Sequence, residues 1–124
     1  MKKIISILGS TGSIGQSTFQ IIDKQKNNFD INILSANKNF NLICKQIIKY
    51  KPNYFIINDE KIYKKTLNKF KKKKYIKILN NYRTLKQRKI SDITISAIPG
   101  ISGLEPTILL TKKSKKILIA NKES

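Results

Sequence analysis

Glycines at positions 9, 12 and 15 stand at a spacing suited to binding a phosphate group. They lie in the segment Gly-Ser-Thr-Gly-Ser-Ile-Gly, directly after the apolar run at 4–8 and directly before a stretch with helical spacing. A dinucleotide loop needs a sharp turn out of a strand, a backbone without a Cβ beside the pyrophosphate, and a helix packed tightly on the sheet. Gly9, Gly12 and Gly15 meet these needs in turn. The segment therefore predicts a phosphate-binding loop.

The start of the helix after this loop is expected to face the phosphates. Its exposed N–H groups, near Ser13 and Ile14, carry the positive end of the helix dipole. The spacing G-x-x-G-x-x-G is a common variation on G-x-G-x-x-G in NADP-binding Rossmann domains. The alternative is a set of ordinary turn glycines in a small α/β protein. The coincidence of strand, loop and helix favours the dinucleotide loop.

A second candidate site follows the apolar run at 31–34, where no acid is present. NAD-specific domains usually place Asp or Glu there to accept hydrogen bonds from the ribose hydroxyls. An acid would repel the 2′-phosphate of NADP, whereas Lys38 would attract it. Asn37 and Asn39 can donate amide hydrogen bonds, and Asn tolerates the left-handed backbone that we expect in such a turn. The turn predicts NADP rather than NAD; the alternative is that Lys38 is one more surface lysine.

Short apolar runs alternate with amphipathic stretches along the chain. Pro52 ends one helix, Asp59 is well placed to cap the next, and 82–89 is interpreted as either helix or loop. This alternation predicts one domain over residues 1–124 of the α/β class, Rossmann-like and doubly wound, with a mainly parallel sheet and helices on both faces. The expected strands are 4–8, 31–34, 54–57, 75–79, 93–97 and 117–120, and the expected helices are 14–25, 40–50, 60–70 and 104–111.

The formal net charge of +19 raises the alternative of a nucleic-acid-binding protein. Nearly all of this charge comes from Lys, and Arg occurs only at Arg83 and Arg88. Arg, with its planar fork, suits phosphate and base recognition better than Lys does. Lys, Ile and Asn are also the residues that A/T-rich codons specify. We therefore predict a solvated basic surface and no nucleic-acid partner.

Cysteine, histidine and apolar runs limit the location and the chemistry. Cys44 is the only cysteine and histidine is absent, so the sequence holds neither a disulfide framework nor a metal-ligand cluster. No apolar run approaches the ~20 residues that span a bilayer. The run at 4–8 is too short for a signal peptide. These features predict a cytoplasmic location and no membrane partner.

A loop of small residues at 96–103 follows an expected strand at the end where open α/β sheets bind ligands. Such a loop lets a nicotinamide ring lie close to the backbone, although an ordinary strand-to-helix connection has the same composition. Taken in order, the segments 9–15, 36–39, 96–107 and 120–124 resemble the 1-deoxy-D-xylulose 5-phosphate reductoisomerase family. The closing Ala-Asn-Lys-Glu-Ser is the most specific of these segments.

The resemblance implies an enzyme that rearranges 1-deoxy-D-xylulose 5-phosphate and reduces the product with NADPH to 2-C-methyl-D-erythritol 4-phosphate. This is the committed step of non-mevalonate isoprenoid biosynthesis, and it requires Mg²⁺ or Mn²⁺ in a protein that is a homodimer at full length. The resemblance also assigns residues to each part of the ligands: Thr11, Gly12, Ser13 and Ile14 to the pyrophosphate, Asn37, Lys38 and Asn39 to the 2′-phosphate, Asn121 and Glu123 to the cofactor, and Lys122 to the substrate.

Two departures from the family pattern qualify these expectations. The family often has Gly where this chain has Asn37, and its metal-binding carboxylates lie just beyond a segment like 121–124. We therefore expect the N-terminal part of a longer reductoisomerase, without its catalytic and C-terminal domains. No residue of this chain is assigned to catalysis or to a metal, and the chain alone is expected to be inactive. The alternative is a complete, non-catalytic NADP-binding module.

Overall fold

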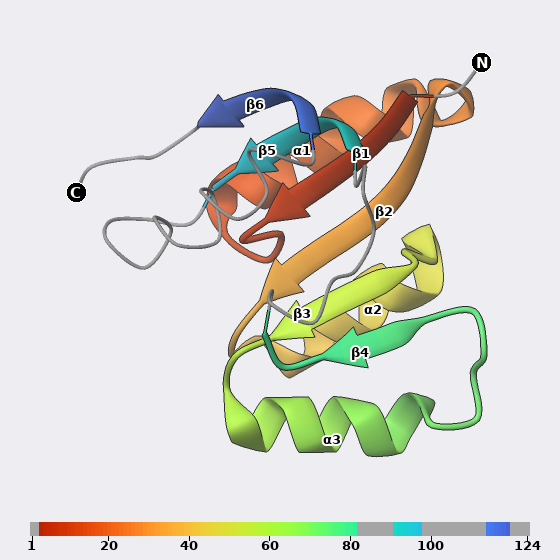
Figure 1. Ribbon diagram of the computed structural model, residues 1–124, viewed down its shortest axis with the longest axis vertical. Coiled ribbons are helices and arrows are strands. Elements are labelled where there is room, and N and C mark those ends of the chain that lie inside the picture. The colour runs from red at the N-terminus through yellow and green to blue at the C-terminus, as the bar shows by residue number, and fades with distance from the viewer. Residues whose placement is uncertain (1–2, 82–90, 98–113, 120–124) are drawn as a thin grey trace.

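A six-stranded sheet with the order β4-β3-β2-β1-β5-β6 forms the centre of the molecule. The computed structural model describes residues 3–81, 91–97 and 114–119. All neighbouring strands run parallel, so their carboxyl ends lie along one edge of the sheet (Figure 1). The strands are β1 (Lys3–Leu8), β2 (Phe29–Ala36), β3 (Tyr54–Ile57), β4 (Lys77–Leu79), β5 (Ser91–Ser96) and β6 (Ser114–Ile119).

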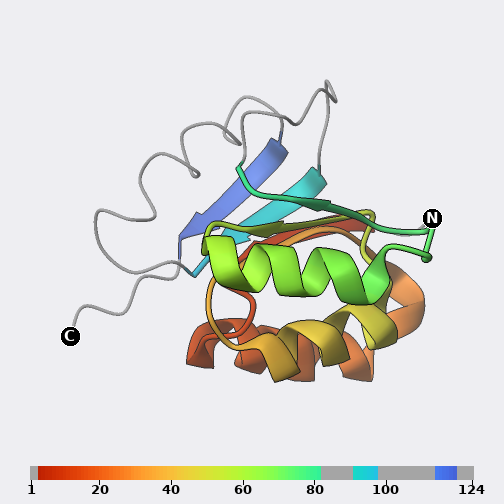
Figure 2. The ribbon, with the colours of Figure 1, turned by 90° about the horizontal axis from the view of Figure 1, so that it is seen from below.

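The described helices lie on one side of this sheet (Figure 2). They are α1 (Ser13–Lys24), α2 (Phe40–Tyr50) and α3 (Glu60–Phe70), with the short 3₁₀ helix η1 (Lys26–Asn28) between α1 and β2. Within the described ranges, no helix combines the length and the apolar character needed to cross a membrane. The helix expected at 104–111 and the ambiguous segment 82–89 lie outside the described residues.

The chain adds strands to the sheet on both sides of β1. It runs outward through β2 and β3 to β4, and then returns to place β5 and β6 on the other side of β1. This reversal makes the sheet doubly wound, and the boundary between β1 and β5 is its topological switch point. The predicted α/β, Rossmann-like fold class with a parallel sheet is confirmed, because every described strand pair is parallel. Within the described residues, the expectation of helices on both faces of the sheet is met on one face.

Both faces of the central strands are buried. Residues 31–36 of β2 are each at most 9% exposed, although successive side chains of a strand point to opposite faces. Such burial on both faces explains why the inner strands read as continuous apolar runs rather than alternating ones. On the helical side, the sheet packs against apolar residues at helical spacing, namely Phe19 and Ile22 of α1 and Ile43 and Ile47 of α2.

Element boundaries match the sequence best where local signals mark them. The helices expected at 40–50 and 60–70 have these bounds in the structure, whereas β2 and β6 begin earlier than predicted and β4 begins later. The polar start of β6 is paired with β5, Ser114 opposite Ser91 and Lys116 opposite Ile93. Pairing partners distant in sequence therefore set the strand ends that hydropathy misplaced.

Asp59 caps α3, as its position before the amphipathic stretch predicted. Its Oδ1 accepts a hydrogen bond from the backbone N–H of Ile62 at 3.1 Å. We expect Asp59→Ala to lower the free energy of unfolding by about 1 kcal/mol, because that N–H loses its partner. Asp59→Asn is the matched control, since asparagine caps equally well. Urea unfolding of the three proteins checks this, and equal losses in both variants would contradict the capping role.

Candidate functional site

The chain turns sharply at Gly9, where β1 ends. Gly9 has a φ of 78°, in the left-handed region that other residues rarely adopt. Its N–H donates to the backbone oxygen of Ser35 at 3.0 Å, and the N–H of Ser10 donates to the same oxygen at 2.8 Å. The end of β2 therefore holds the first residues of the loop, and the turn predicted at Gly9 is present.

Gly15 packs α1 directly against the backbone of the loop. A Cβ at Gly15 would lie 2.5 Å from the backbone oxygen of Gly9 and 2.7 Å from the Cα and carbonyl carbon of Ser10. Distances this short admit no side chain, so the helix rests on the loop only because residue 15 is glycine. A Cβ at Gly12 would meet only the oxygen of Gly9, at an ordinary 3.6 Å. Gly12 is exposed, so its missing Cβ leaves room on the ligand side.

The first turn of α1 presents unpaired backbone donors. Gly12 is the N-cap, no side chain caps the helix, and no acid stands in the first turn. The first helical bond runs from the N–H of Gln16 to the oxygen of Gly12 at 2.9 Å. The N–H groups of Ser13, Ile14 and Gly15 consequently have no partner within the helix. This end of α1 carries the positive end of the helix dipole and suits an anion.

The loop opens beside the switch point of the sheet. The N–H of Ala97, just past β5, donates to the oxygen of Leu8 at the end of β1, at 2.8 Å. The carboxyl ends of β1 and β5 therefore lie side by side at this edge of the sheet. Open α/β sheets bind ligands in the crevice that forms at such a point. Of the small-residue segment 96–103, Ser96 and Ala97 are described, and the remainder lies outside the described residues.

The turn at 37–39 follows β2 along the same edge of the sheet, and its residues are exposed. Asn39 caps α2, its Oδ1 accepting from the N–H of Leu42 at 3.2 Å. The Oδ1 of Asn37 accepts from the N–H of Asn58 at 3.3 Å. With both amide oxygens engaged, the NH₂ groups remain as donors in the turn that also carries the exposed Lys38. The turn thus presents donors and positive charge, as a phosphate requires.

The left-handed backbone expected in this turn is absent. Among the described residues other than glycine, only Lys51, at the end of α2, has a positive φ. Asn39 instead has φ −82° and ψ 80°. The expectation was wrong because the asparagines stabilise the turn through side-chain bonds to backbone N–H groups rather than through their own backbone conformation. Asn37 therefore does not stand in for a glycine in the left-handed region.

Gln46 supports the loop from α2, a role that the sequence pattern did not reveal. Its Nε2 donates to the oxygen of Ser10 at 2.9 Å, and its Oε1 accepts from the Oγ of Ser10 at 2.7 Å. Both side chains are buried. The available signal was the position of Gln46, three residues after Ile43 on the face of α2 that is otherwise apolar. A polar side chain there needs a buried partner.

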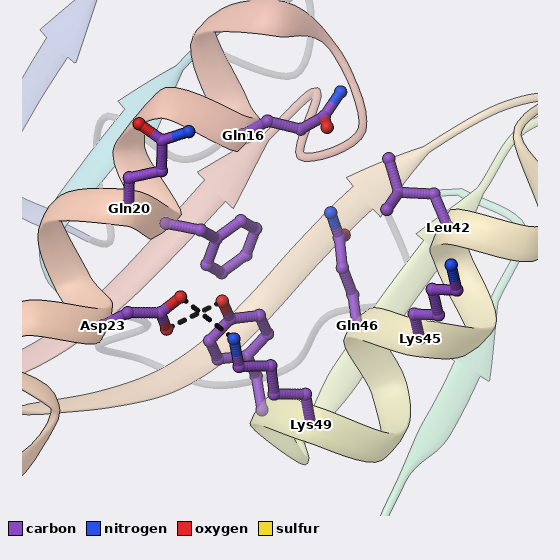
Figure 3. A pocket seen from close by; sticks show the side chains of 9 residues that line it. Gln16, Gln20, Asp23, Leu42, Lys45, Gln46 and Lys49 are labelled. Atoms are coloured by element: carbon purple, nitrogen blue, oxygen red, sulfur yellow. Dashed lines mark hydrogen bonds and ion pairs between the residues drawn. The ribbon is translucent and has the colours of Figure 1, made fainter.

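A groove of about 290 Å³ lies between α1 and α2, with Gln46 at its inner wall (Figure 3). Across it, Asp23 of α1 accepts hydrogen bonds from the Nζ of Lys49 at 3.0 Å and the hydroxyl of Tyr50 at 2.9 Å. The rings of Phe19 and Tyr50 stack with centroids 4.2 Å apart. These contacts join the helix that starts at the glycine loop to the helix that starts at the turn.

Tyr50 gives this contact a pH dependence. Burial raises the pKa of its phenol above the usual 10.0, and the hydrogen bond to Asp23 raises the pKa further. The stabilisation is therefore present below pH 10 and is lost as the pH rises through the higher pKa of the folded chain. We expect Tyr50→Phe to cost about 1 kcal/mol or less at neutral pH and to remove the phenol whose pKa is raised.

Tyrosinate absorbance against pH, in the folded and urea-unfolded chain, measures that titration. Tyr75→Phe is the control, because Tyr75 is 40% exposed. Loss of the late phase in Tyr75→Phe rather than in Tyr50→Phe would contradict the assignment.

Asn121, Lys122 and Glu123 lie outside the described residues. Across 3–81, 91–97 and 114–119, no group of three or more His, Cys, Asp or Glu side chains is arranged to hold a metal ion. Cys44 is a free, buried thiol, and burial raises its pKa. Thr11, Gly12, Ser13 and Ile14 do stand together at the loop, and Asn37, Lys38 and Asn39 stand together at the turn.

The strand order, the glycine loop at the switch point and the donor-rich turn define a dinucleotide-binding α/β domain of the Rossmann type. A family model described as 1-deoxy-D-xylulose 5-phosphate reductoisomerase matches residues 5–124. The chain belongs to the 1-deoxy-D-xylulose 5-phosphate reductoisomerase family.

Individual relatives agree with this family. Reductoisomerases from Pelagibacter ubique and Wigglesworthia glossinidia brevipalpis are 40% and 41% identical to the chain, over 100% and 99% of its length. A solved reductoisomerase in complex with magnesium superimposes with a TM-score of 0.86 at 27% identity over 100% of the chain. Another, in complex with NADPH, fosmidomycin and magnesium, has a TM-score of 0.84 at 29% identity over 98% of the chain.

Each comparison covers only part of the relative. The chain spans 32% of the length of both curated relatives, and 32% and 31% of the two solved structures.

Proposed function

We propose that this chain binds NADPH as the cofactor-binding domain of a 1-deoxy-D-xylulose 5-phosphate reductoisomerase. The observation that carries the proposal is the loop itself, where Gly15 seats α1 against Ser10 and leaves the first N–H groups of the helix open. Membership of the family and the NADPH found in a solved relative support the choice of cofactor. The acid-free turn beside Lys38 favours NADPH over NADH.

The described residues fit the two phosphate groups of this cofactor. We assign Thr11, Gly12, Ser13 and Ile14 to the pyrophosphate, because the exposed Gly12 leaves room there and the helix start supplies donors. Asn37, Lys38 and Asn39 are assigned to the 2′-phosphate, with amide and ammonium donors. The remaining assignments rest on the resemblance alone: Asn121 and Glu123 to the cofactor, and Lys122 to the substrate.

In the reaction that we propose for the whole protein, 1-deoxy-D-xylulose 5-phosphate is rearranged and reduced to 2-C-methyl-D-erythritol 4-phosphate. Bound NADPH supplies the hydride, and this chain holds and orients it. Mg²⁺ or Mn²⁺ belongs to the carboxylates that the resemblance places beyond residue 124. We further propose a cytoplasmic homodimer with no nucleic-acid or membrane partner. The 124 residues alone are expected to bind cofactor without turnover.

Titration of the chain with NADPH and with NADH, followed by nicotinamide fluorescence, tests the proposal. We expect a lower Kd for NADPH. Equal Kd values would contradict the role given to Lys38, and absence of binding would contradict the function itself. Duplex DNA added as a competitor tests the alternative raised by the net charge of +19. Displacement of NADPH by DNA, steeply weakened by salt, would favour a nucleic-acid site instead.

A further inference from the structure

Ser10 is held from both elements that flank the turn at 37–39. From β2, the backbone oxygen of Ser35 accepts a hydrogen bond from the N–H of Ser10 at 2.8 Å, and the Oγ of Ser10 lies 3.3 Å from the same oxygen. From α2, Gln46 makes its donor and acceptor bonds to the oxygen and the Oγ of Ser10. β2 ends just before Asn37, and α2 begins just after Asn39. The strand before the turn and the helix after it are thus both bonded to one residue of the glycine loop.

The contact from α2 is buried and fully paired. Ser10 is 0% exposed and Gln46 is 4% exposed. In Figure 3, Gln46 rises from α2 into the space between the two helices, away from the contact of Asp23 with Lys49. A glutamine amide offers a donor and an acceptor on one rigid plane, and Ser10 engages both. Unpaired, such buried polar atoms would cost free energy, so the contact specifies one placement of α2 against the loop.

This placement matters for a ligand that occupies both sites. The pyrophosphate and the 2′-phosphate are joined through one adenosine, so the loop and the turn must stand at one separation to hold both. Gln46 lies about 9 Å along α2 from Phe40, at roughly 1.5 Å of rise per residue. Over this length α2 is rigid. The bonds between Gln46 and Ser10 therefore also fix where Lys38 and Asn39, just before α2, lie relative to the loop.

We infer that Gln46 is a positioning residue that sets the separation of the glycine loop and the 2′-phosphate turn, and thereby the preference for NADPH over NADH. The inference rests on the proposed function, because it assumes that these two sites hold the two phosphate groups. NADH lacks the 2′-phosphate, so it can stay bound to the glycine loop and move with it if the loop shifts. NADPH cannot do so without losing its contacts at the turn.

Gln46→Met tests this role, because methionine has nearly the same length and shape and makes neither bond. We expect the Kd for NADPH to rise about tenfold, and the Kd for NADH to rise about threefold or less. The preference for NADPH then falls by about threefold or more. Gln20→Met is the matched control: Gln20 is an exposed glutamine of α1 in the same groove, and we expect both Kd values to stay unchanged.

A double-mutant cycle with Lys38→Ala measures the coupling free energy between Gln46 and Lys38 in NADPH binding. A merely structural role of Gln46 would leave this coupling at zero. If Gln46 holds the turn, Lys38→Ala weakens NADPH binding less in the Gln46→Met background than in the wild type. Should Gln46→Met fail to fold, Ser10→Ala removes only the Oγ arm and is expected to lower the preference by a smaller factor. Thermal unfolding and circular dichroism establish that each variant is folded before titration.

The outcomes separate this inference from the proposed function. A wild-type chain that binds neither cofactor would contradict both. A wild-type chain that prefers NADPH, with Gln46→Met raising both Kd values by the same factor, would overturn the inference and leave the function intact. Unchanged Kd values, or strictly additive effects in the cycle, would overturn it as well. A reduced preference together with a non-additive cycle supports it.

Discussion

Gly15→Ala is expected to lower the free energy of unfolding by about 3 kcal/mol, at the upper end of overpacking costs. The added Cβ would lie 2.5 Å from the oxygen of Gly9 and 2.7 Å from two backbone atoms of Ser10. None of these is the end of a flexible side chain, so α1 must move away from the loop. That shift also moves the first-turn N–H groups, and NADPH binding is expected to fall beyond detection. Urea unfolding and NADPH titration measure the two effects.

Gly12→Ala is the matched control, because it adds the same methyl group elsewhere in the loop. Its Cβ would meet only ordinary contact at 3.6 Å, and Gly12 has φ −76°, which alanine adopts readily. We expect a stability loss below about 1 kcal/mol, from alanine being the poorer N-cap. NADPH binding should still weaken, because the methyl group occupies the side of the loop assigned to the pyrophosphate. Equal losses of stability in both variants would contradict the packing role of Gly15.

Lys38→Glu is expected to reverse the cofactor preference. The substitution removes a charge-assisted contact to the 2′-phosphate and adds a like charge beside it. We expect the Kd for NADPH to rise about a hundredfold, corresponding to about 3 kcal/mol. A glutamate near this position can also accept hydrogen bonds from ribose hydroxyls, as in NAD-specific domains, so NADH binding should hold or improve. Parallel titrations with both cofactors at one salt concentration give the ratio.

Lys45→Glu controls for the general effect of charge. Lys45 is also an exposed lysine of the same region, on α2, and it lines the groove rather than the turn. Its reversal changes the net charge by the same amount, so it should affect NADPH and NADH through long-range attraction only. A similar change in preference in both variants would show that Lys38 acts through net charge. An unchanged preference in Lys38→Glu would place the 2′-phosphate elsewhere.

Much of the fold follows from signals that lie close together in the sequence. Pro52 cannot continue a helix, so α2 must end before it, and Asp59 caps the start of α3. Both effects act on the backbone of only a few neighbouring residues. The ends of β2 and β6 depend instead on backbone pairing with strands distant in sequence. Polar residues such as Ser35 and Ser114 join these strands because a neighbour offers them a partner, which hydropathy does not record.

The same distinction explains what was predictable about the site. The glycine loop could be recognised because its requirements act on consecutive residues. The role of Lys38 could be predicted because no Asp or Glu stands after the second strand, where NAD-specific domains usually place one. The contacts of Ser10 with Ser35 and Gln46 join segments 25 and 36 residues away. The side chain of Asn37 likewise bonds to the backbone of Asn58, which directly follows β3. Such contacts exist only after the elements have packed.

The central place of β1 in the sheet has a consequence for the order of assembly. Ile5 is in register with Ile31 on one side and with Ile93 on the other. During synthesis, the ribosome releases β2, β3 and β4 before β5, so one edge of β1 must wait for a partner strand that is made much later than β1 itself. Contacts of such long range slow folding and leave an open strand edge exposed to other chains in the meantime. The nascent protein is therefore expected to be most prone to aggregation just before Ser91 emerges.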